Sequence, residues 1–244
     1  MNATTLVYLN TNSHMPGHFT FFTEHIEADR AVFDASEHRH AIIALRYKVG
    51  DAIDFTNGKG LVCKGFIDEV RKDSFSATVA SQHQVEQKPG LRIACGIIKS
   101  SDRMEWMVEK CTECGVKSVY FVATQASERT RLNLERLKKT SIAALKQSHG
   151  AWLPQLEEMS WKSLLGMQTP EKYIAALGET PGIHLHNLKP ISTTDRMVLI
   201  GPEGDFTGEE VQQAQAAGYS LLSLGALVLR TETAAMVVAA KHIV

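Results

Sequence analysis

The chain has 244 residues, of which 44% are apolar and 22% are charged, and this composition excludes a disordered protein. Its formal net charge of -1 excludes a uniformly basic nucleic-acid binder but leaves room for a local basic patch. The four cysteines are too few for a disulfide scaffold in a chain of this length, and they fit a reducing compartment.

The N-terminal residues predict an extension rather than a folded element. Residues 1–17 carry no charged side chain and show no clear periodicity, so we expect a flexible extension. They lack the basic start and long apolar core of a signal peptide, and no apolar run of the chain is long enough to cross a bilayer. We therefore expect a cytoplasmic protein with no membrane contact.

Residues 18–86 predict a small β-barrel. Asn57 and Gly58 lie between two strand-like runs, as in a hairpin turn, and "FSATVA" at 75–80 supplies another short strand. Many short strands joined by tight turns are typical of a small barrel. The polar stretch 82–90, with Pro89 and Gly90, predicts a linker.

Strands and helices alternate in the second predicted domain, residues 90–244. The predicted strands are 91–98, 118–123, 172–177, 197–200 and 220–224, and the predicted helices are 102–114, 133–149, 208–217 and a last one from about 231. Such alternation is typical of a mostly parallel sheet. Between two of these strands, residues 178–196 contain no clear element, and connections of this length are uncommon unless functional.

Two groups of residues suggest metal or redox chemistry, but the pattern favours simpler interpretations. Cys111 and Cys114 belong to the apolar stripe of a predicted helix near its C-terminal end, whereas a redox pair gains its low thiolate pKa at a helix N-terminus. The histidines of "HRH" at 38–40 and "HLH" at 184–186 have no cysteine or carboxylate at a recognised ligand spacing. We expect no metal site.

A basic segment leaves two interpretations open. Residues 129–146 contain one acidic side chain, Glu135, and six basic ones, namely Arg129, Arg131, Arg136, Lys138, Lys139 and Lys146. They predict either a solvated helix face or a surface that contacts phosphates.

The stretch "LIGPEGDFTGEEV" at 199–211 predicts a strand that breaks sharply before a helix. Gly201 and Gly204 permit close approach of the backbone to a ligand, and Thr207 with Glu210 forms a capping box. A second break follows at Gly225, where Thr231 or Thr233 can cap the last helix. Both breaks are expected at the carboxyl edge of the sheet, where open α/β folds bind ligands.

These motifs resemble a known family. "IGPEGDFTGEEV" followed by "LGALVLRTETA" resembles the signature of the RsmE family, SPOUT-class methyltransferases that modify ring nitrogen-3 of a uridine in small-subunit (16S) ribosomal RNA. "KSSDRMEWMVEKCTECGV", "SERT" with "ALKQSHGAWLP", "FFTEH" and "HAIIALRYKVGD" are similar to further family segments. The resemblance covers about residues 18–244. The sequence departs from the family pattern at Ser100 with Ser101, at Cys114 and at Asp205. Asp205 could narrow the cofactor pocket that the family resemblance implies, or change its charge.

The resemblance implies an N-terminal PUA-like β-barrel, then a SPOUT α/β domain with a C-terminal trefoil knot, and a homodimer formed through the knot helices. It also implies that S-adenosylmethionine binds in three loops, at Leu177, Gly178, Ile200, Gly201, Pro202, Glu203, Gly204, Leu224, Gly225, Leu229, Arg230, Thr231 and Thr233. We expect ribosomal RNA or the assembled small subunit to contact Arg39, His40, Arg46, Lys48, Lys99, Arg103, Arg129 and Arg131.

For catalysis we expect Arg230 to stabilise negative charge on the uracil carbonyl oxygens. Glu203 or Glu232 would act as general base or would orient Arg230 and backbone amides, or both would only cap turns and pair with Arg230. Two other functions stay open: a non-catalytic RNA-binding protein on the same fold, and a SPOUT methyltransferase for another RNA position.

Overall fold

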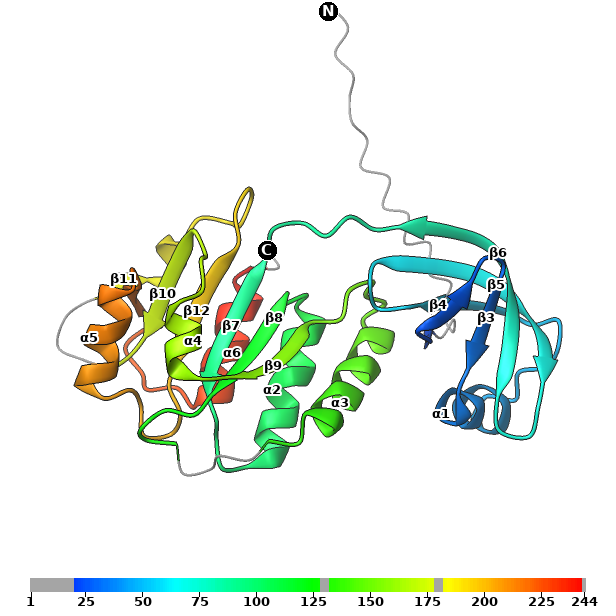
Figure 1. Cartoon of the computed structure of the whole chain (residues 1–244), viewed down its shortest axis with the longest axis horizontal. Coiled ribbons are helices and arrows are strands. Elements are labelled where there is room, and N and C mark those ends of the chain that lie inside the picture. Colours follow the sequence, from blue (N-terminus) through cyan, green and yellow to red (C-terminus); the bar gives the residue numbers. More distant parts are fainter. Residues whose placement is uncertain (1–19, 128–131, 178–181, 243–244) are drawn as a thin grey trace, which may run out of the picture.

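The N-terminal part of the chain folds into a curled, barrel-like sheet at one end of the molecule (Figure 1). The structure, a computed structural model, describes residues 20–127, 132–177 and 182–242. In sheet order the strands are β1 (Thr20–Phe22), β4 (Ala52–Thr56), β5 (Leu61–Val70), β6 (Phe75–Gln84), β3 (Arg30–Phe33) and β2 (His25–Glu27). Two short helical segments, α1 (Ala35–His38) and the π-helical η1 (Arg39–Ala44), follow β3.

Backbone irregularities bend the two longest strands around the barrel core. The β5–β6 register shifts between Lys64 and Gly65, and such a bulge bends a strand. A Cβ at Gly65 would lie 2.3 Å from the Thr78 carbonyl oxygen, so this close approach needs glycine. The predicted hairpin at Asn57 is present, and its side chain accepts hydrogen bonds from two backbone N–H groups of the turn. The core enclosed by the sheet is built around the buried rings of Phe21, Phe33, Phe55 and Phe75.

The second sheet has seven strands that all pair in parallel. In sheet order they are β11 (Ile183–His184), β13 (Ser220–Ser223), β10 (Glu171–Ala175), β12 (Arg196–Ile200), β7 (Leu91–Gly96), β8 (Ser118–Val122) and β9 (Gln155–Met159). The central strands β7, β8 and β12 are almost entirely buried, because helices cover both of their faces. The predicted parallel sheet is thereby confirmed.

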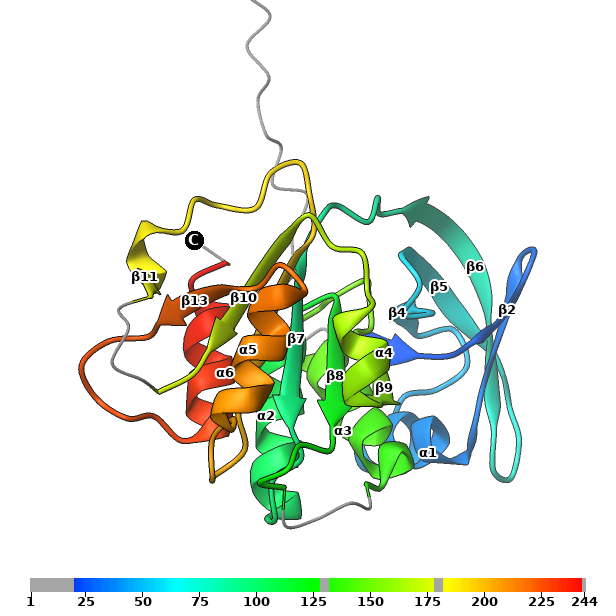
Figure 2. The same ribbon diagram turned by 60° about the vertical axis from the view of Figure 1, so that its left-hand side comes forward.

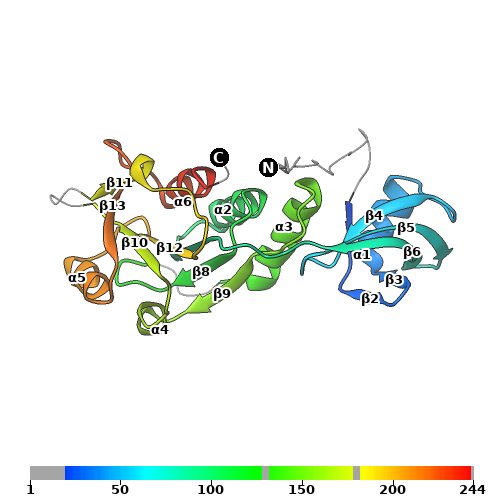
Figure 3. The ribbon, with the colours of Figure 1, turned by 90° about the horizontal axis from the view of Figure 1, so that it is seen from above.

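Helices flank this sheet on two sides. Figure 3 shows α2 (Ser101–Glu113), α3 (Leu134–Gln147) and α6 (Thr231–Ala240) on one face, with α4 (Trp161–Leu165) and α5 (Gly208–Ala216) on the other. The predicted capping box of Thr207 and Glu210 starts α5. Ser100, a departure from the family pattern, caps α2 by accepting a hydrogen bond from the Arg103 N–H. The predicted cap of the last helix was wrong: Arg230 is the N-cap residue of α6, with no side-chain cap bond, because the Thr231 hydroxyl is used elsewhere.

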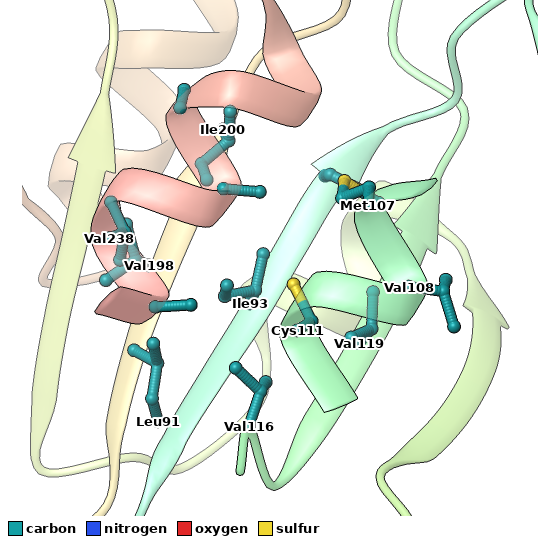
Figure 4. Packing of buried hydrophobic residues seen from close by; sticks show 14 of the residues in the cluster. Leu91, Ile93, Met107, Val108, Cys111, Val116, Val119, Val198, Ile200 and Val238 are labelled. Atoms are coloured by element: carbon teal, nitrogen blue, oxygen red, sulfur yellow. The ribbon is translucent and has the colours of Figure 1, made fainter. Parts of the chain in front are cut away.

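The stretch that showed no clear element is described from residue 182, and this part packs beside the last helix. After β10 the chain runs outward through β11 and the 3-10 turn η2 (Leu185–Asn187) before it returns as β12 (Figure 2). Leu185 and Leu188 of this connection pack into the same buried cluster as Ala235 and Val238 of α6. After β13 the chain turns back as α6, which packs against β12, β7 and α2, as expected for the C-terminal trefoil knot. Figure 4 shows α6 and α2 packed through this cluster.

The two sheets are joined by backbone bonds as well as by the linker. The Gly60 N–H donates to the Ala151 carbonyl at 2.8 Å, and the Leu153 N–H donates to the Gly58 carbonyl at 2.9 Å. The Lys138 ammonium on α3 lies 3.1 Å from the Glu24 carboxylate beside β2. The barrel is thus fixed beside α3. Among the described residues, no helix combines the length and apolar character needed to span a membrane.

Candidate functional site

A cavity of about 590 Å³ opens at the carboxyl ends of β10, β12 and β13. Three chain segments enclose it: one after β10 that includes Leu177, one after β12 from Ile200 to Asp205, and one from β13 to the start of α6. The two bends predicted at Gly201 and Gly225 are therefore brought together at one edge of the sheet. The remaining wall is the Arg103 side chain at the start of α2.

Close packing of the backbone dictates the sharp turn after β12. A Cβ at Gly96 would lie 2.4 Å from Pro202 Cδ, so Pro202 can pack onto β7 only because position 96 is glycine. The Asp205 N–H donates to the Pro202 carbonyl at 3.0 Å and closes the turn. A Cβ at Gly204 would meet Ala126 Cβ at 2.8 Å, so this glycine serves the protein's own packing.

Asp205 connects two of the three segments. Its φ is 60°, a left-handed conformation in which aspartate is one of the better tolerated side chains. Its carboxylate Oδ2 accepts a hydrogen bond from the Leu177 N–H at 2.7 Å. The residue that departs from the family pattern thus lines the cavity and holds the first segment against the second.

Thr231 connects the second and third segments. Its hydroxyl donates to the Gly201 carbonyl at 2.8 Å, and both residues are buried. This bond joins the end of β12 to the first residue of α6, across 30 positions of sequence.

Arg103 makes the strongest polar contacts at the cavity. Its Nε and one terminal nitrogen donate to the two carboxylate oxygens of Glu232 at 2.7 and 2.6 Å, and its other terminal nitrogen lies 3.0 Å from Glu203 Oε1. Burial acts to raise the pKa of Glu232, but the bonds from Arg103 and the backbone outweigh it, so the pKa is lowered. The lowered pKa makes the Glu232 carboxylate a weak base and therefore a poor proton acceptor. The expected pairing of both acids with Arg230 was wrong, because Arg103 takes that position.

Most of the predicted cofactor residues line this cavity. They are Leu177, Ile200, Gly201, Pro202, Glu203, Leu224, Gly225, Leu229, Arg230 and Thr231. Gly204 and Thr233 do not contribute to its wall, and Gly178 lies outside the described residues. Asp205, which was expected to affect the pocket, also lines it. The lining residues that the sequence did not assign to the cavity are Arg103, Ala175, Ala176, Gly182, Leu221, Leu222, Ser223, Leu227, Val228 and Ala234. Most of these flank a predicted bend, so extending each bend by a few residues would have found them.

The residues predicted to bind RNA lie in several places. Arg39 and His40 are in η1 of the barrel, and Arg46 and Lys48 follow it as exposed residues. Lys99 is exposed just before α2. Arg39 also lines a groove of about 720 Å³ between the barrel and α3. Arg103 faces the cavity instead of an open surface, and Arg129 with Arg131 lies outside the described residues.

Several cations of the basic segment have structural partners. Lys138 pairs with Glu24, and the Lys146 ammonium lies 2.5 Å from buried Glu37, so both tie α3 to the barrel. The Arg136 guanidinium lies 2.7 Å from Glu105 on α2. These contacts favour a structural role for this part of α3 over a phosphate-binding one.

Cys111 lies in the core, as the apolar stripe of its helix predicted. Cys111 is fully buried in the core, and burial raises the pKa of its thiol well above the ordinary value. The facing ring nitrogens of His184 and His186 lie 2.6 Å apart. Within the described ranges, no three histidine, cysteine or acidic side chains are grouped as a metal site requires.

Comparison with known proteins identifies the family. A family model described as an RNA methyltransferase domain matches residues 86–243, and the chain belongs to this family. The ribosomal RNA small subunit methyltransferase E of Rickettsia conorii is 27% identical over 208 residues, which cover 83% of this chain and 85% of that protein. The protein of the same name from Bacillus subtilis is 26% identical over 226 residues, which cover 85% and 87%.

Solved structures show the same fold. A probable rRNA-methyltransferase from Porphyromonas gingivalis superposes with a TM-score of 0.83 at 32% identity, covering 91% of this chain and 95% of that one. A ribosomal RNA small subunit methyltransferase E from Neisseria gonorrhoeae, bound to S-adenosyl methionine, gives 0.79 at 24% identity over 91% and 95%. The predicted resemblance to the RsmE family and the predicted fold are confirmed.

Proposed function

We propose that the protein transfers a methyl group from S-adenosylmethionine to ring nitrogen-3 of a uridine in small-subunit ribosomal RNA. The observation that carries this proposal is the cavity between the three knot segments, which has Arg230 at its edge. The names of the relatives, and the ligand in the Neisseria structure, support the choice of substrate and methyl donor.

The cavity residues fit such a ligand. Its volume of about 590 Å³ suits a nucleoside-sized molecule. Ala175, Leu222 and Leu229 supply apolar wall for an adenine ring, and the segment ends supply backbone polar groups. The exposed carboxylate of Glu203 offers negative charge to a cationic sulfonium and ammonium. When bound, S-adenosylmethionine supplies a methyl group on positively charged sulfur.

The chain's own residues would orient the uridine and stabilise its charge. Removal of the imide proton leaves negative charge on the uracil carbonyl oxygens. Arg230 is exposed at the N-terminus of α6, where its guanidinium and the helix dipole both favour such charge. Glu203 has an exposed carboxylate with a single bond from Arg103, so we assign it the role of proton acceptor. Glu232 is assigned to hold Arg103.

We propose that the barrel provides part of the RNA surface through Arg39, Arg46 and Lys48. Replacing Arg46 or Lys48 by alanine is expected to reduce the slope of log affinity against log salt by about 1 for each phosphate that the variant no longer binds. Exposed Lys72, at the β5–β6 turn, offers a control substitution on the same barrel. An unchanged slope of log affinity against log salt would show that these barrel residues do not contact the RNA. Contacts by Arg129 and Arg131 remain predictions of the same kind.

We further propose a homodimer in the cytoplasm, formed through the knot helices. Trp106 on α2 and Met236 on α6 are exposed apolar side chains on two helices that pack together, and Leu227 and Val228 are 82% and 73% exposed beside the cavity. Exposed apolar surface of this kind is typical of an interface. Sedimentation of the wild type as a dimer, and of Met236→Glu as a monomer, is the expected result; a monomeric wild type would contradict it.

Mass spectrometry of ribosomal RNA from cells lacking the gene tests the function. We expect loss of one methyl group at uridine nitrogen-3 in small-subunit RNA. Loss at another position would indicate a different target. Calorimetry with S-adenosylmethionine separates the enzyme from a non-catalytic RNA-binding protein, since a folded chain that does not bind it would be the latter.

A further inference from the structure

Arg103 and Arg230 line the same cavity but have opposite surroundings. Arg103 is held by three charged hydrogen bonds to two carboxylates. The Arg230 side chain has no hydrogen bond or ion pair with any other residue that the structure describes, and only its backbone carbonyl is bonded, to the Ala234 N–H. An exposed guanidinium without a partner inside the protein is available for an external anion.

Glu232 is the acid best placed to capture Arg230. It lies two residues after Arg230 in the first turn of α6, is 7% exposed, and experiences the positive charge of Arg230. A buried carboxylate without a partner is costly, so it takes up the nearest cation available. Arg103, reaching in from α2, occupies both of its oxygens.

We propose that Arg103 is a positioning residue for the reaction: by saturating Glu232 it leaves Arg230 unpaired and directed to the substrate. The inference rests on the proposed function, since it takes Arg230 as the group that faces the uracil oxygens. Arg103 acts through Arg230 and does not itself contact the RNA, contrary to the expectation from sequence.

Arg103 also links two of the cavity segments, because it contacts Glu203 as well as Glu232. Glu232 belongs to the third cavity segment and Glu203 to the second, so the guanidinium joins both to the start of α2. The bond to Glu203 is single and exposed, whereas the bonds to Glu232 are two and partly buried, so Glu232 is the fixed partner.

A double variant tests the proposal. Arg103→Met alone leaves Glu232 to capture Arg230, so kcat for methyl transfer is expected to fall by about 10²-fold with little change in KM for RNA, as a misplaced catalytic group produces. The double variant Arg103→Met with Glu232→Gln removes the carboxylate that would bind Arg230 as well as the guanidinium that occupies this carboxylate in the wild type. We expect this double variant to recover kcat to within about fivefold of the wild type, the remaining loss reflecting the exposed contact to Glu203.

The outcomes separate the alternatives. If Arg103 contacts the substrate directly, the folded double variant stays as inactive as the single one, and the proposal is overturned. Lys110→Met, which removes a cation at the other end of α2, is the matched control and should leave kcat unchanged. A wild type without methyl transfer would defeat the proposed function itself.

A crystal structure of Arg103→Met gives a reading independent of activity. We expect the Arg230 guanidinium within hydrogen-bond distance of the Glu232 carboxylate. An Arg230 that stays apart from Glu232 in this variant would overturn the proposal.

Discussion

Asp205 shows how one side chain sets the geometry of the cavity. Its left-handed backbone would suit glycine best, yet only a side chain with an acceptor can bind the Leu177 N–H. The conformational cost at Asp205 is therefore offset by a bond that fixes the segment after β10.

Replacing Asp205 tests this role. Asp205→Gly removes the acceptor and is expected to weaken S-adenosylmethionine binding about fivefold, the effect of one net hydrogen bond. Asp205→Asn keeps an acceptor oxygen and tolerates the left-handed region, so its affinity should stay close to that of the wild type. Calorimetry measures both. Equal losses in the two variants would mean that the negative charge matters and the bond does not.

Thr231 is the corresponding residue between the second and third segments. Thr231→Val keeps the shape but leaves the buried Gly201 carbonyl without its partner, so we expect the free energy of unfolding to fall by about 1–3 kcal/mol. Urea unfolding measures the loss, and Thr233→Val in the same first turn of α6 is the matched control. Equal stability of the two variants would contradict a role for this bond in fastening the knot.

Helix α6 is apolar on nearly all sides, and the fold covers most of its surface. It is covered by the sheet, by α2 and by the β10–β12 connection, and its end is anchored where His242 meets buried Arg196. Arg196 in turn donates two hydrogen bonds to Glu171. The neutral imidazole accepts from Arg196 through Nε2 and donates to the Val238 carbonyl through Nδ1.

This anchor predicts a pH dependence of stability. Burial lowers the pKa of His242; the bond to Val238 opposes this only in part, and the charge of Arg196 adds to the lowering. The unfolded chain therefore binds a proton more readily, so stability is lost as the pH falls through the unfolded value of about 6.5. His242→Gln keeps a donor and an acceptor but cannot titrate.

Urea unfolding at pH 7.5 and at pH 5.5 measures this loss of stability. The wild type should lose more stability between these pH values than His242→Gln does, whereas exposed His83→Gln should behave as the wild type. Identical losses in wild type and His242→Gln would contradict the neutral anchor.

The sequence predicted those elements whose burial leaves a local pattern. The continuous apolar runs of β7, β8 and β12 and the apolar stripe of α2 are of this kind. Strand β9 was missed because it is an edge strand with mostly polar, exposed residues, and α4 because it is a single short turn. The knot came from family resemblance, since periodicity carries no information on which segment passes beneath another.

The site was predictable to the extent that it consists of backbone bends. Gly201 and Gly225 predicted two of its segments. The contacts of Arg103, in contrast, are with residues 100 and 129 positions away in the sequence. A cation in a local sequence window looks the same whether it contacts RNA or a distant carboxylate. For this reason the sequence placed Arg103 among the RNA-binding residues and gave no sign that it lines the cavity.

At the scale of the whole molecule, the β4–β5 hairpin fixes the barrel to the catalytic sheet. Gly60 has a φ of 92°, and a Cβ there would lie 2.4 Å from the Trp152 ring and from Gln84 Nε2. Gly60→Ala therefore combines backbone strain with displacement of Trp152. Gly50, with a φ of 94° and open space around it, is a matched control for the strain alone.

We expect Gly50→Ala to lower the free energy of unfolding by about 1–2 kcal/mol, the cost of a left-handed side chain, and Gly60→Ala to lower it by more. Tryptophan fluorescence should shift in Gly60→Ala, because Trp152 loses its place. Equal destabilisation by both substitutions, without a fluorescence change, would show that the hairpin does not depend on this close contact.

The central claim is that the knot cavity directs a methyl group to nitrogen-3 of a ribosomal uridine through Arg230. Its most direct test incubates the purified protein with small subunits from cells lacking the gene and S-adenosylmethionine labelled in the methyl group, followed by mass spectrometry of the nucleosides. Labelled N3-methyluridine with the wild type, and its near absence with Arg230→Ala, is the predicted result. Label in another nucleoside, or equal labelling by both proteins, would contradict the account.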